Sequence, residues 1–186
     1  MRSYQINNMN HAIILLAGEG ARFDKKEDKS LIKINDRYMC EYILDTLTKN
    51  KNIDTITLVV QRENIKEFAK IISQTESDKP INVIVGDKQY RQISLANGFD
   101  SLNAKPDDIV ITLDGDRPFV TTKLINKSID VAKKQGFSSA CLPIYDSVIS
   151  FTTYQDRKIL NLIQTPQSFV AKHFHKNFLK DKGDLI

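Results

Sequence analysis

The sequence alternates short apolar runs with longer amphipathic segments, and this alternation restricts the fold more than any other feature. The apolar runs are rich in β-branched residues and bounded by turn residues, which predicts strands at His11 to Leu16, Thr55 to Val60, Asn82 to Val85, Ile109 to Leu113 and Ser139 to Pro143. Helices are predicted at Met39 to Lys49, Asn64 to Ser73, Gln89 to Ser101 and Thr122 to Lys134. Because parallel neighbours need a crossover, the chain is predicted to be an α/β protein with a mostly parallel sheet flanked by helices.

Three features mark where the alternation of predicted strands and helices ends or changes. Gly136 follows the fourth predicted helix, where a C-terminal glycine is expected. The stretch from Tyr145 to Ile163 is polar and rich in threonine, and it predicts a projecting hairpin. The segment from Phe169 to Leu179 has helical spacing and is predicted to be a further helix.

Composition excludes several classes of protein. A length of 186 residues suits one domain, and 41% hydrophobic with 27% charged residues is ordinary for a globular chain. No apolar run is long enough to cross a membrane, and the first ten residues lack a secretory pattern, so a cytoplasmic location is expected. Cys40 and Cys141 lie in separate apolar segments and are predicted to be buried free thiols. The net charge of +4 comes from interspersed charges, which argues against nucleic-acid binding.

Loops that leave strands are informative, because ligands of such sheets bind beyond the carboxyl ends of the strands. Gly18 and Gly20 directly follow the first strand, with Arg22 and Lys29 further along the same loop. Glycine amides and cationic side chains can bind phosphates, although a plain tight turn accounts for two close glycines equally well. The spacing fits neither the dinucleotide fingerprint nor a P-loop.

Three other loops carry polar residues. Asp114 and Asp116 follow the strand that ends at Leu113, where they could hold Mg²⁺, bind sugar hydroxyls or form an ordinary Asp-Gly turn. Gly86 and Ser94 flank a helix start, so Ser94 could contact a base or ribose, or the segment could be only a capped helix. Pro166 could present Thr165 rigidly.

In their order along the chain, these clusters resemble the 2-C-methyl-D-erythritol 4-phosphate cytidylyltransferase family and the related ribitol 5-phosphate cytidylyltransferases. The similar residues span nearly the whole chain. They are Ala12-Ile13-Ile14-Leu15 with Ala17-Gly18-x-Gly20-x-Arg22, Lys29, Arg91-Gln92-x-Ser94-x-x-Asn97-Gly98, Asp114-x-x-Arg117-Pro118-Phe119-Val120, Pro143-x-x-Asp146, Asp156-Arg157 and Gln164-Thr165-Pro166-Gln167. The resemblance implies a Rossmann-like nucleotidyltransferase fold with a projecting β-arm.

The resemblance also implies a reaction, in which CTP and a polyol phosphate give a CDP-polyol and pyrophosphate with Mg²⁺ required. Methylerythritol phosphate is the first choice of substrate and ribitol 5-phosphate the alternative. A catalytically weak nucleotide-binding homologue, or a sugar-phosphate nucleotidyltransferase that uses UTP or GTP, are the other hypotheses. A homodimer formed through the arm is implied as well.

The residue roles implied by the resemblance fall into three groups. Arg22 and Lys29 would stabilise the transition state. The nucleotide would be bound by Ala17, Gly18, Gly20, Gly86, Ser94 and Asp114, with Asp114 also the expected metal ligand. The substrate would be bound by Arg117, Ser147, Arg157 and Thr165, with Arg157 acting across the dimer.

The chain also departs from the pattern of this family. Leu16 stands where an alanine is usual, and Asp116 occupies a position that is usually small and apolar. We expect residues 1–8 to be an N-terminal extension and 9–186 to be one nucleotidyltransferase domain with its arm at about 145–163. The strand and helix with which the family usually ends are expected to be absent.

Overall fold

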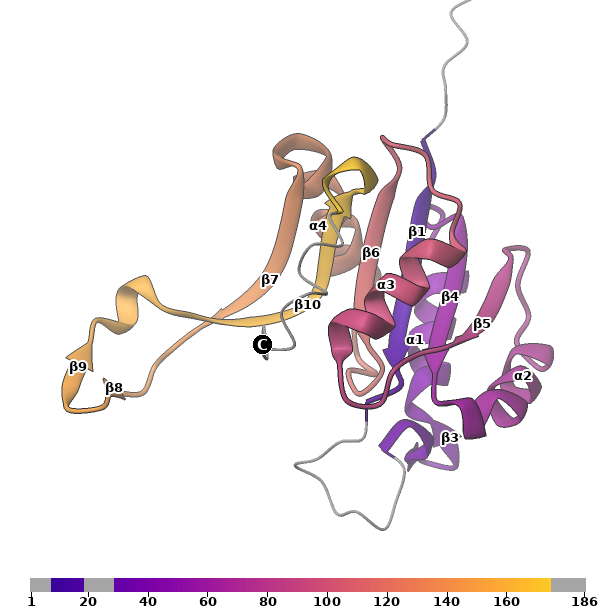
Figure 1. Cartoon of the computed structure of the whole chain (residues 1–186), viewed down its shortest axis with the longest axis horizontal. Helices are drawn as coiled ribbons and strands as arrows, with labels where there is room; N and C mark the ends of the chain where they lie inside the picture. Colours follow the sequence, from indigo (N-terminus) through magenta and orange to yellow (C-terminus); the bar gives the residue numbers. More distant parts are fainter. Residues whose placement is uncertain (1–7, 19–28, 175–186) are drawn as a thin grey trace, which may run out of the picture.

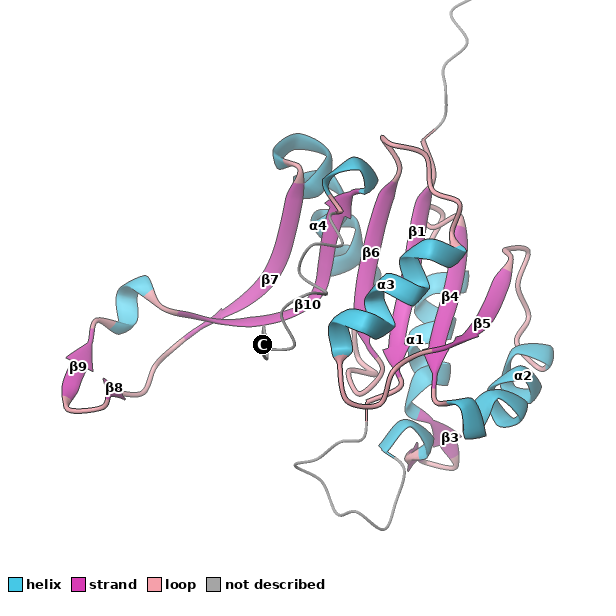
Figure 2. Cartoon of the chain, viewed as in Figure 1, coloured by secondary structure: helices cyan, strands magenta, loops and turns pink. Residues whose placement is uncertain are grey.

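The structure is a computed structural model that describes residues 8–18 and 29–174, and its centre is a six-stranded sheet (Figures 1 and 2). The sheet order is β5-β4-β1-β6-β10-β7, and only β10 runs antiparallel to its neighbours. The strands are β1 Asn10–Leu16, β4 Thr55–Val60, β5 Ile81–Val85, β6 Ile109–Asp114, β7 Phe137–Pro143 and β10 Asn161–Val170. The helices are α1 Met39–Thr48, α2 Ile65–Ser73, α3 Arg91–Ser101 and α4 Thr122–Gln135. The predicted α/β fold is confirmed.

Helices cover both faces of the sheet because its central strands are apolar on both sides. On β1, Ala12, Ile14 and Leu16 pack in one core with residues of α1, α2 and α4. Ile13 and Leu15 belong to a second core with residues of α3, which lies on the opposite face (Figure 1). Continuous apolar strands of this kind are typical of a parallel sheet that is buried on both faces.

Helix α4 begins and ends where its capping residues predict. Thr121 accepts a hydrogen bond from the Leu124 amide at 3.2 Å and so caps the start of α4. Gly136 follows α4 with a φ of 90°, a left-handed conformation that favours glycine. The prediction of a C-terminal glycine at this position is confirmed.

Two short hairpins complete the chain. Strands β2 Lys33–Ile34 and β3 Arg37–Tyr38 pair just before α1 and were not predicted. Strands β8 Val148–Ser150 and β9 Thr153–Gln155 pair at the end of a projecting arm, as predicted for this stretch (Figure 1). Three-residue 3₁₀ helices are found at Lys29–Leu31, Arg62–Asn64, Arg157–Ile159 and Ala171–His173. Among the described residues, no helix has the length and apolar character needed to span a membrane.

In the C-terminal part, one strand was missed and one predicted helix is wrong. Strand β10 was not predicted, because its polar residues and internal Pro166 hide a segment that pairs with both β6 and β7. The predicted helix from Phe169 to Leu179 is wrong over its described part, where a strand ends and a 3₁₀ helix follows. Phe174 stacks on α3 instead, where its ring centroid lies 4.2 Å from that of Phe99.

The two cysteines differ in environment. Cys40 is buried, as predicted, and burial raises the pKa of its thiol to about 12. The prediction that Cys141 is buried is wrong, because it lies on the edge strand β7 where that strand leaves the helix-covered sheet. Neither thiol forms a disulfide.

Candidate active site

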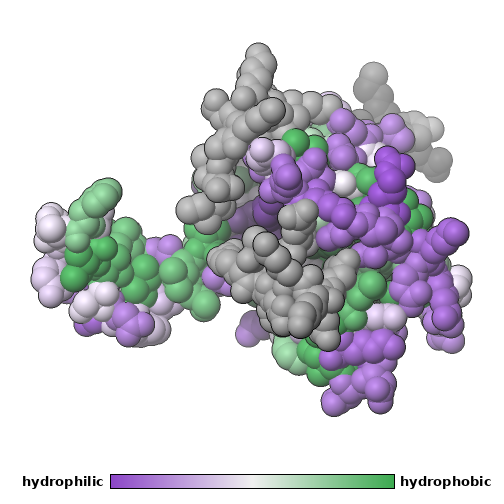
Figure 3. Space-filling model, turned by 60° about the horizontal axis from the view of Figure 1, so that its bottom comes forward, coloured by the Kyte–Doolittle hydropathy of each residue, from purple (hydrophilic) through white to green (hydrophobic). Residues whose placement is uncertain are grey.

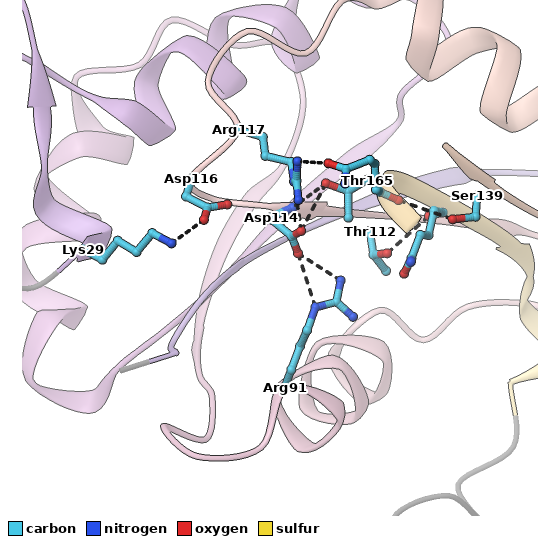
Figure 4. A network of polar contacts seen from close by, with 10 residues as sticks. Lys29, Arg91, Thr112, Asp114, Asp116, Arg117, Ser139 and Thr165 are labelled. Atoms are coloured by element: carbon cyan, nitrogen blue, oxygen red, sulfur yellow. Dashed lines mark hydrogen bonds and ion pairs between the residues drawn. The ribbon is translucent and has the colours of Figure 1, made fainter. Parts of the chain in front are cut away.

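The candidate site lies at the carboxyl edge of the parallel strands, where the loops after β1, β5 and β6 meet. The register pairs Leu16 with Val60 and Leu15 with Asp114, so β1 and β6 end side by side. Parallel strands bring such loops to one edge, which is why residues distant in sequence are expected to meet there. Lys29 reaches the same edge from its 3₁₀ helix (Figure 4).

The loop after β1 is open where the structure describes it. Ala17 is buried, but a Cβ atom built on Gly18 would meet no atom of the described residues within 4 Å. The side chain of Gln61 donates a hydrogen bond to the Gly18 carbonyl at 3.4 Å. Gly20 and Arg22, which were predicted to bind phosphate, lie outside the described residues.

The loop after β5 packs tightly against β4 and the residue that follows β1, and Ser94 holds it by hydrogen bonds. A Cβ atom on Gly86 would lie 2.6 Å from Ala17 Cβ and from Val59 Cγ1, so only glycine fits. The Ser94 hydroxyl accepts a hydrogen bond from the Asp87 amide and donates one to the Asp87 carbonyl, both at 2.9 Å. Ser94 therefore shapes this loop, and its contact with a base or ribose stays a prediction.

At this edge of the sheet, the carboxylate of Asp114 at the end of β6 accepts hydrogen bonds from Arg91 and Arg117 (Figure 4). Arg91 donates to its Oδ1 atom from Nη2 at 3.0 Å and from Nε at 3.3 Å. Arg117 donates to Oδ2 at 3.2 Å and also binds the Gln164 side chain. The Thr165 hydroxyl accepts from the Asp114 amide at 3.2 Å. The structure thus brings together Asp114 and Arg117, which belong to one motif of the sequence, and Thr165, which belongs to another.

A metal ion held by protein side chains alone does not fit this arrangement. Asp114, the predicted ligand, already has both carboxylate oxygens in contact with guanidinium groups. Within residues 8–18 and 29–174, no group of three His, Cys, Asp or Glu side chains could hold a metal ion. Mg²⁺ commonly keeps one or two protein carboxylates and takes its other ligands from substrate phosphates and water. The requirement for Mg²⁺ stays a prediction, and the geometry does not favour Asp114 as its direct ligand.

Lys29 is paired with Asp116 in the loop after β6. The Nζ atom of Lys29 lies 2.5 Å from Oδ2 of Asp116, and both side chains are about one-third exposed. The predicted phosphate-binding cation thus already has a carboxylate partner.

The two arm residues lie apart from this edge within one chain. Ser147 and Arg157 are exposed on the arm, which extends away from the sheet (Figure 1). Arg157 donates a hydrogen bond to the backbone carbonyl of Tyr145, also on the arm. Their role in substrate binding stays a prediction, and Arg157 is predicted to act across a dimer.

Three residues of the site were given no role from the sequence: Gln61, which was not noted, and Asp87 and Arg91, which lie in a noted cluster. Asp87 accepts hydrogen bonds from the amides of Gln89 and Tyr90 and so turns the chain into α3. The Asp-x-x-Tyr-Arg segment after a strand could have signalled this turn. The pairing of Arg91 with Asp114 depends on the crossover from α3 to β6 and has no local signal.

Comparisons with known proteins identify the family to which this sequence is similar. The family model of 2-C-methyl-D-erythritol 4-phosphate cytidylyltransferase matches residues 10–184. The enzyme of that name from Clostridioides difficile is 34% identical over 166 residues, which cover 87% of this chain and 69% of the relative. The one from Thermosipho melanesiensis is 33% identical over 178 residues, covering 91% and 77%.

A solved structure supports the same grouping. The 4-diphosphocytidyl-2C-methyl-D-erythritol synthase from Anaerococcus prevotii superposes with a TM-score of 0.74 at 28% identity, covering 89% of this chain and 71% of that one. The family match over residues 10–184 includes the loops after β1, β5 and β6, in which the site residues lie. The chain therefore belongs to the 2-C-methyl-D-erythritol 4-phosphate cytidylyltransferase family.

Proposed function

We propose that this chain transfers the cytidylyl group of CTP to 2-C-methyl-D-erythritol 4-phosphate and releases pyrophosphate. The observation that carries the proposal is the family match over residues 10–184, which contains every loop of the candidate site. The names of the matched family and relatives favour this polyol phosphate over ribitol 5-phosphate.

The chemistry is a displacement at phosphorus. A phosphate oxygen of the polyol phosphate forms a bond to the α-phosphorus of CTP, and the bond from that phosphorus to the bridging oxygen of pyrophosphate breaks. No covalent bond to the protein is needed, so catalysis consists of positioning and charge stabilisation. Lys29 and Arg22 would supply cationic donors to the charge that develops on the phosphate oxygens.

The rest of the site would position the two substrates. Within the part of the chain that the structure describes, the backbone at Gly18 is open and would leave room for phosphates, while Gly86 and Ser94 shape the neighbouring loop. Arg117 and Thr165, held against Asp114, offer hydrogen-bonding groups to the polyol. Ser147 and Arg157 of a second chain would complete the substrate site through the arm.

Three further parts of the proposal concern conditions and partners. The reaction would need Mg²⁺, held mainly by the nucleotide phosphates because Asp114 is engaged by Arg91 and Arg117. The protein would be a homodimer. Its location would be the cytoplasm, since nucleoside triphosphates are available there.

The test is pyrophosphate release from CTP by the purified chain with each polyol phosphate in turn. Lys29→Ala should lower kcat/KM by about 10²- to 10³-fold, as is typical when one donor to a developing oxyanion is removed. Lys33→Ala is the matched control, because Lys33 lies over the Tyr38 ring, 4.5 Å from its centroid, and should be dispensable. Turnover that is equal in wild type and Lys29→Ala, or turnover only with another nucleotide or polyol, would contradict the proposal.

A further inference from the structure

The ion pair of Lys29 and Asp116 connects the 3₁₀ helix at Lys29–Leu31 with the loop after β6, and the proposed reaction needs both segments (Figure 4). Lys29 belongs to the segment after the glycine loop, and Asp116 belongs to the loop after β6. Their charged atoms lie 2.5 Å apart, and the side chains are 36% and 35% exposed. An exposed pair of this kind is weak, so a strongly charged ligand can displace it.

Asp116 contacts different side chains from Asp114, which lies two residues earlier. Asp114 is engaged by Arg91, Arg117 and Thr165, whereas Asp116 contacts Lys29. A change at Asp116 therefore leaves the Asp114 contacts in place. This separation allows the role of Asp116 to be tested by itself.

The phosphates of a nucleotide need the same ammonium group that Asp116 occupies. The Lys29 ammonium has three N–H donors and one positive charge, so a carboxylate beside it reduces its attraction for phosphate. A carboxylate close to bound phosphates also repels them directly. Both effects weaken phosphate binding, but only the first acts through Lys29.

We propose that Asp116 is a positioning residue that holds the Lys29 ammonium in the free protein and competes with the phosphates of CTP and of pyrophosphate for it. This inference rests on the proposed function, because it assumes that phosphates bind at Lys29. Asp116 then restrains nucleotide affinity and, after transfer, takes Lys29 back from pyrophosphate. The product leaves more readily as a result.

The test compares Asp116→Asn with wild type by calorimetric titration of CTP and, separately, of pyrophosphate, both with Mg²⁺. The substitution keeps the size of the side chain and removes its charge. The dissociation constants of both ligands should fall by about two- to fivefold, which corresponds to the loss of one exposed ion pair. Inhibition of turnover by pyrophosphate should become stronger by the same factor.

A matched control comes from the opposite end of β6. Asp107 precedes that strand and pairs with Lys172 at 2.8 Å, also on the surface. Asp107→Asn changes the net charge of the protein as much as Asp116→Asn does, but it should leave both dissociation constants unchanged. Tightening of equal size in this control would overturn the proposal.

The double variant Asp116→Asn with Lys29→Ala decides whether Asp116 acts through Lys29. The gain in affinity should be smaller in the Lys29→Ala background than in the wild type. Gains of equal size in both backgrounds, no gain at all, or weaker binding in Asp116→Asn would each overturn the inference. If wild type binds neither CTP nor pyrophosphate, the proposed function fails. If it binds and turns over CTP but Asp116→Asn behaves like wild type, only this inference fails.

Discussion

At the scale of single residues, the site depends on how Asp114 is held. Its carboxylate, 26% exposed, receives hydrogen bonds from two guanidinium groups that come from different elements. Hydrogen bonds between charged groups are stronger than those between neutral groups. Arg91 lies at the start of α3 and Arg117 follows β6, so Asp114 links the start of α3 to the loop after β6.

We predict that Arg91→Gln lowers kcat/KM for the polyol phosphate by about tenfold, because Asp114 loses the partner that fixes it from α3. Folding stability should change by less than about 1 kcal/mol, since the pair is partly exposed. The control is Arg37→Gln, because the Arg37 side chain is also 43% exposed and pairs with an aspartate, Asp45. Steady-state kinetics in which both variants equal wild type would refute the role of Arg91.

Some residue-level features could be read from the sequence and others could not. Leu16 was recognised as unusual, but its effect needs three dimensions, because it fills the space that a side chain on Gly115 would occupy. A Cβ atom at Gly115 would lie 2.1 Å from Leu16 Cδ2. Lys29 and Asp116 were both noted, yet their pairing is a tertiary contact between loops that no local pattern records.

At the scale of elements, prediction succeeded where local pattern and tertiary environment agree. The parallel strands β1, β4 and β6 are apolar runs with sharp ends, and α2 and α4 have clear amphipathic spacing. Strand β10 was missed because it is a strand through its pairing with β6 and β7, and the pattern of its own residues does not indicate one. The site was predictable through its loops, since strand ends indicate where ligands bind.

The opposite end of the sheet is held together by Asp108, which is buried just before β6. Its carboxylate accepts hydrogen bonds from the Met9 amide at 2.9 Å and the Lys105 amide at 2.7 Å, and it contacts His11 at 3.2 Å. Burial by itself raises the pKa of Asp108, but these partners more than offset burial, so its pKa lies below the usual 3.8.

We therefore predict a stability contribution from Asp108 that depends on pH. A carboxyl whose pKa is lowered on folding stabilises the protein above its unfolded pKa of about 4, and this contribution is lost as the pH falls through the lower folded value. Asp108→Asn should lower the free energy of unfolding at pH 7 by about 1–3 kcal/mol. Urea unfolding at pH 7 and pH 3 should show a smaller further loss in the variant than in wild type.

The control for this experiment is the neighbouring Asp107→Asn. Asp107 is exposed, so the free energy of unfolding should change by less than about 0.5 kcal/mol at pH 7. An Asp108→Asn variant that is as stable as wild type, or that loses as much stability on acidification, would show that the buried contacts do not hold this end of the sheet.

At the scale of the whole molecule, the arm extends away from the sheet and its large apolar side chains are exposed in a single chain (Figure 1). Large apolar side chains gather on it, and on the face that Figure 3 shows, hydrophobic residues cluster on the arm beside a body whose described surface is mainly hydrophilic. They include Tyr145, Ile149, Phe151, Tyr154, Ile159, Leu162 and Ile163, all more than half exposed. Concentrations of this kind mark interaction surfaces. The sequence analysis described this stretch as polar and rich in threonine, and it did not predict that so many apolar side chains of the arm would be exposed.

Mixing two inactive variants would test whether the arm of one chain completes the site of another. Lys29→Ala and Arg157→Ala should each be nearly inactive alone. If Arg157 acts across a homodimer, a mixed dimer keeps one intact site, formed by the unchanged Lys29 of one chain and the unchanged Arg157 of the other. An equal mixture, exchanged by dilution and reconcentration, should then recover about a quarter of the wild-type activity.

If Arg157 acts within its own chain, every site in the mixture carries one of the two substitutions, and no activity returns. The recovery should also depend on the apolar surface of the arm. Adding Tyr154→Asp, which places a charge on a side chain that is 74% exposed, should abolish the recovery and give monomers in sedimentation velocity. Adding Phe137→Asp instead, 71% exposed at the far end of β7, should leave both the dimer and the recovery intact. Recovery that persists with Tyr154→Asp would mean that the chains associate through a different surface.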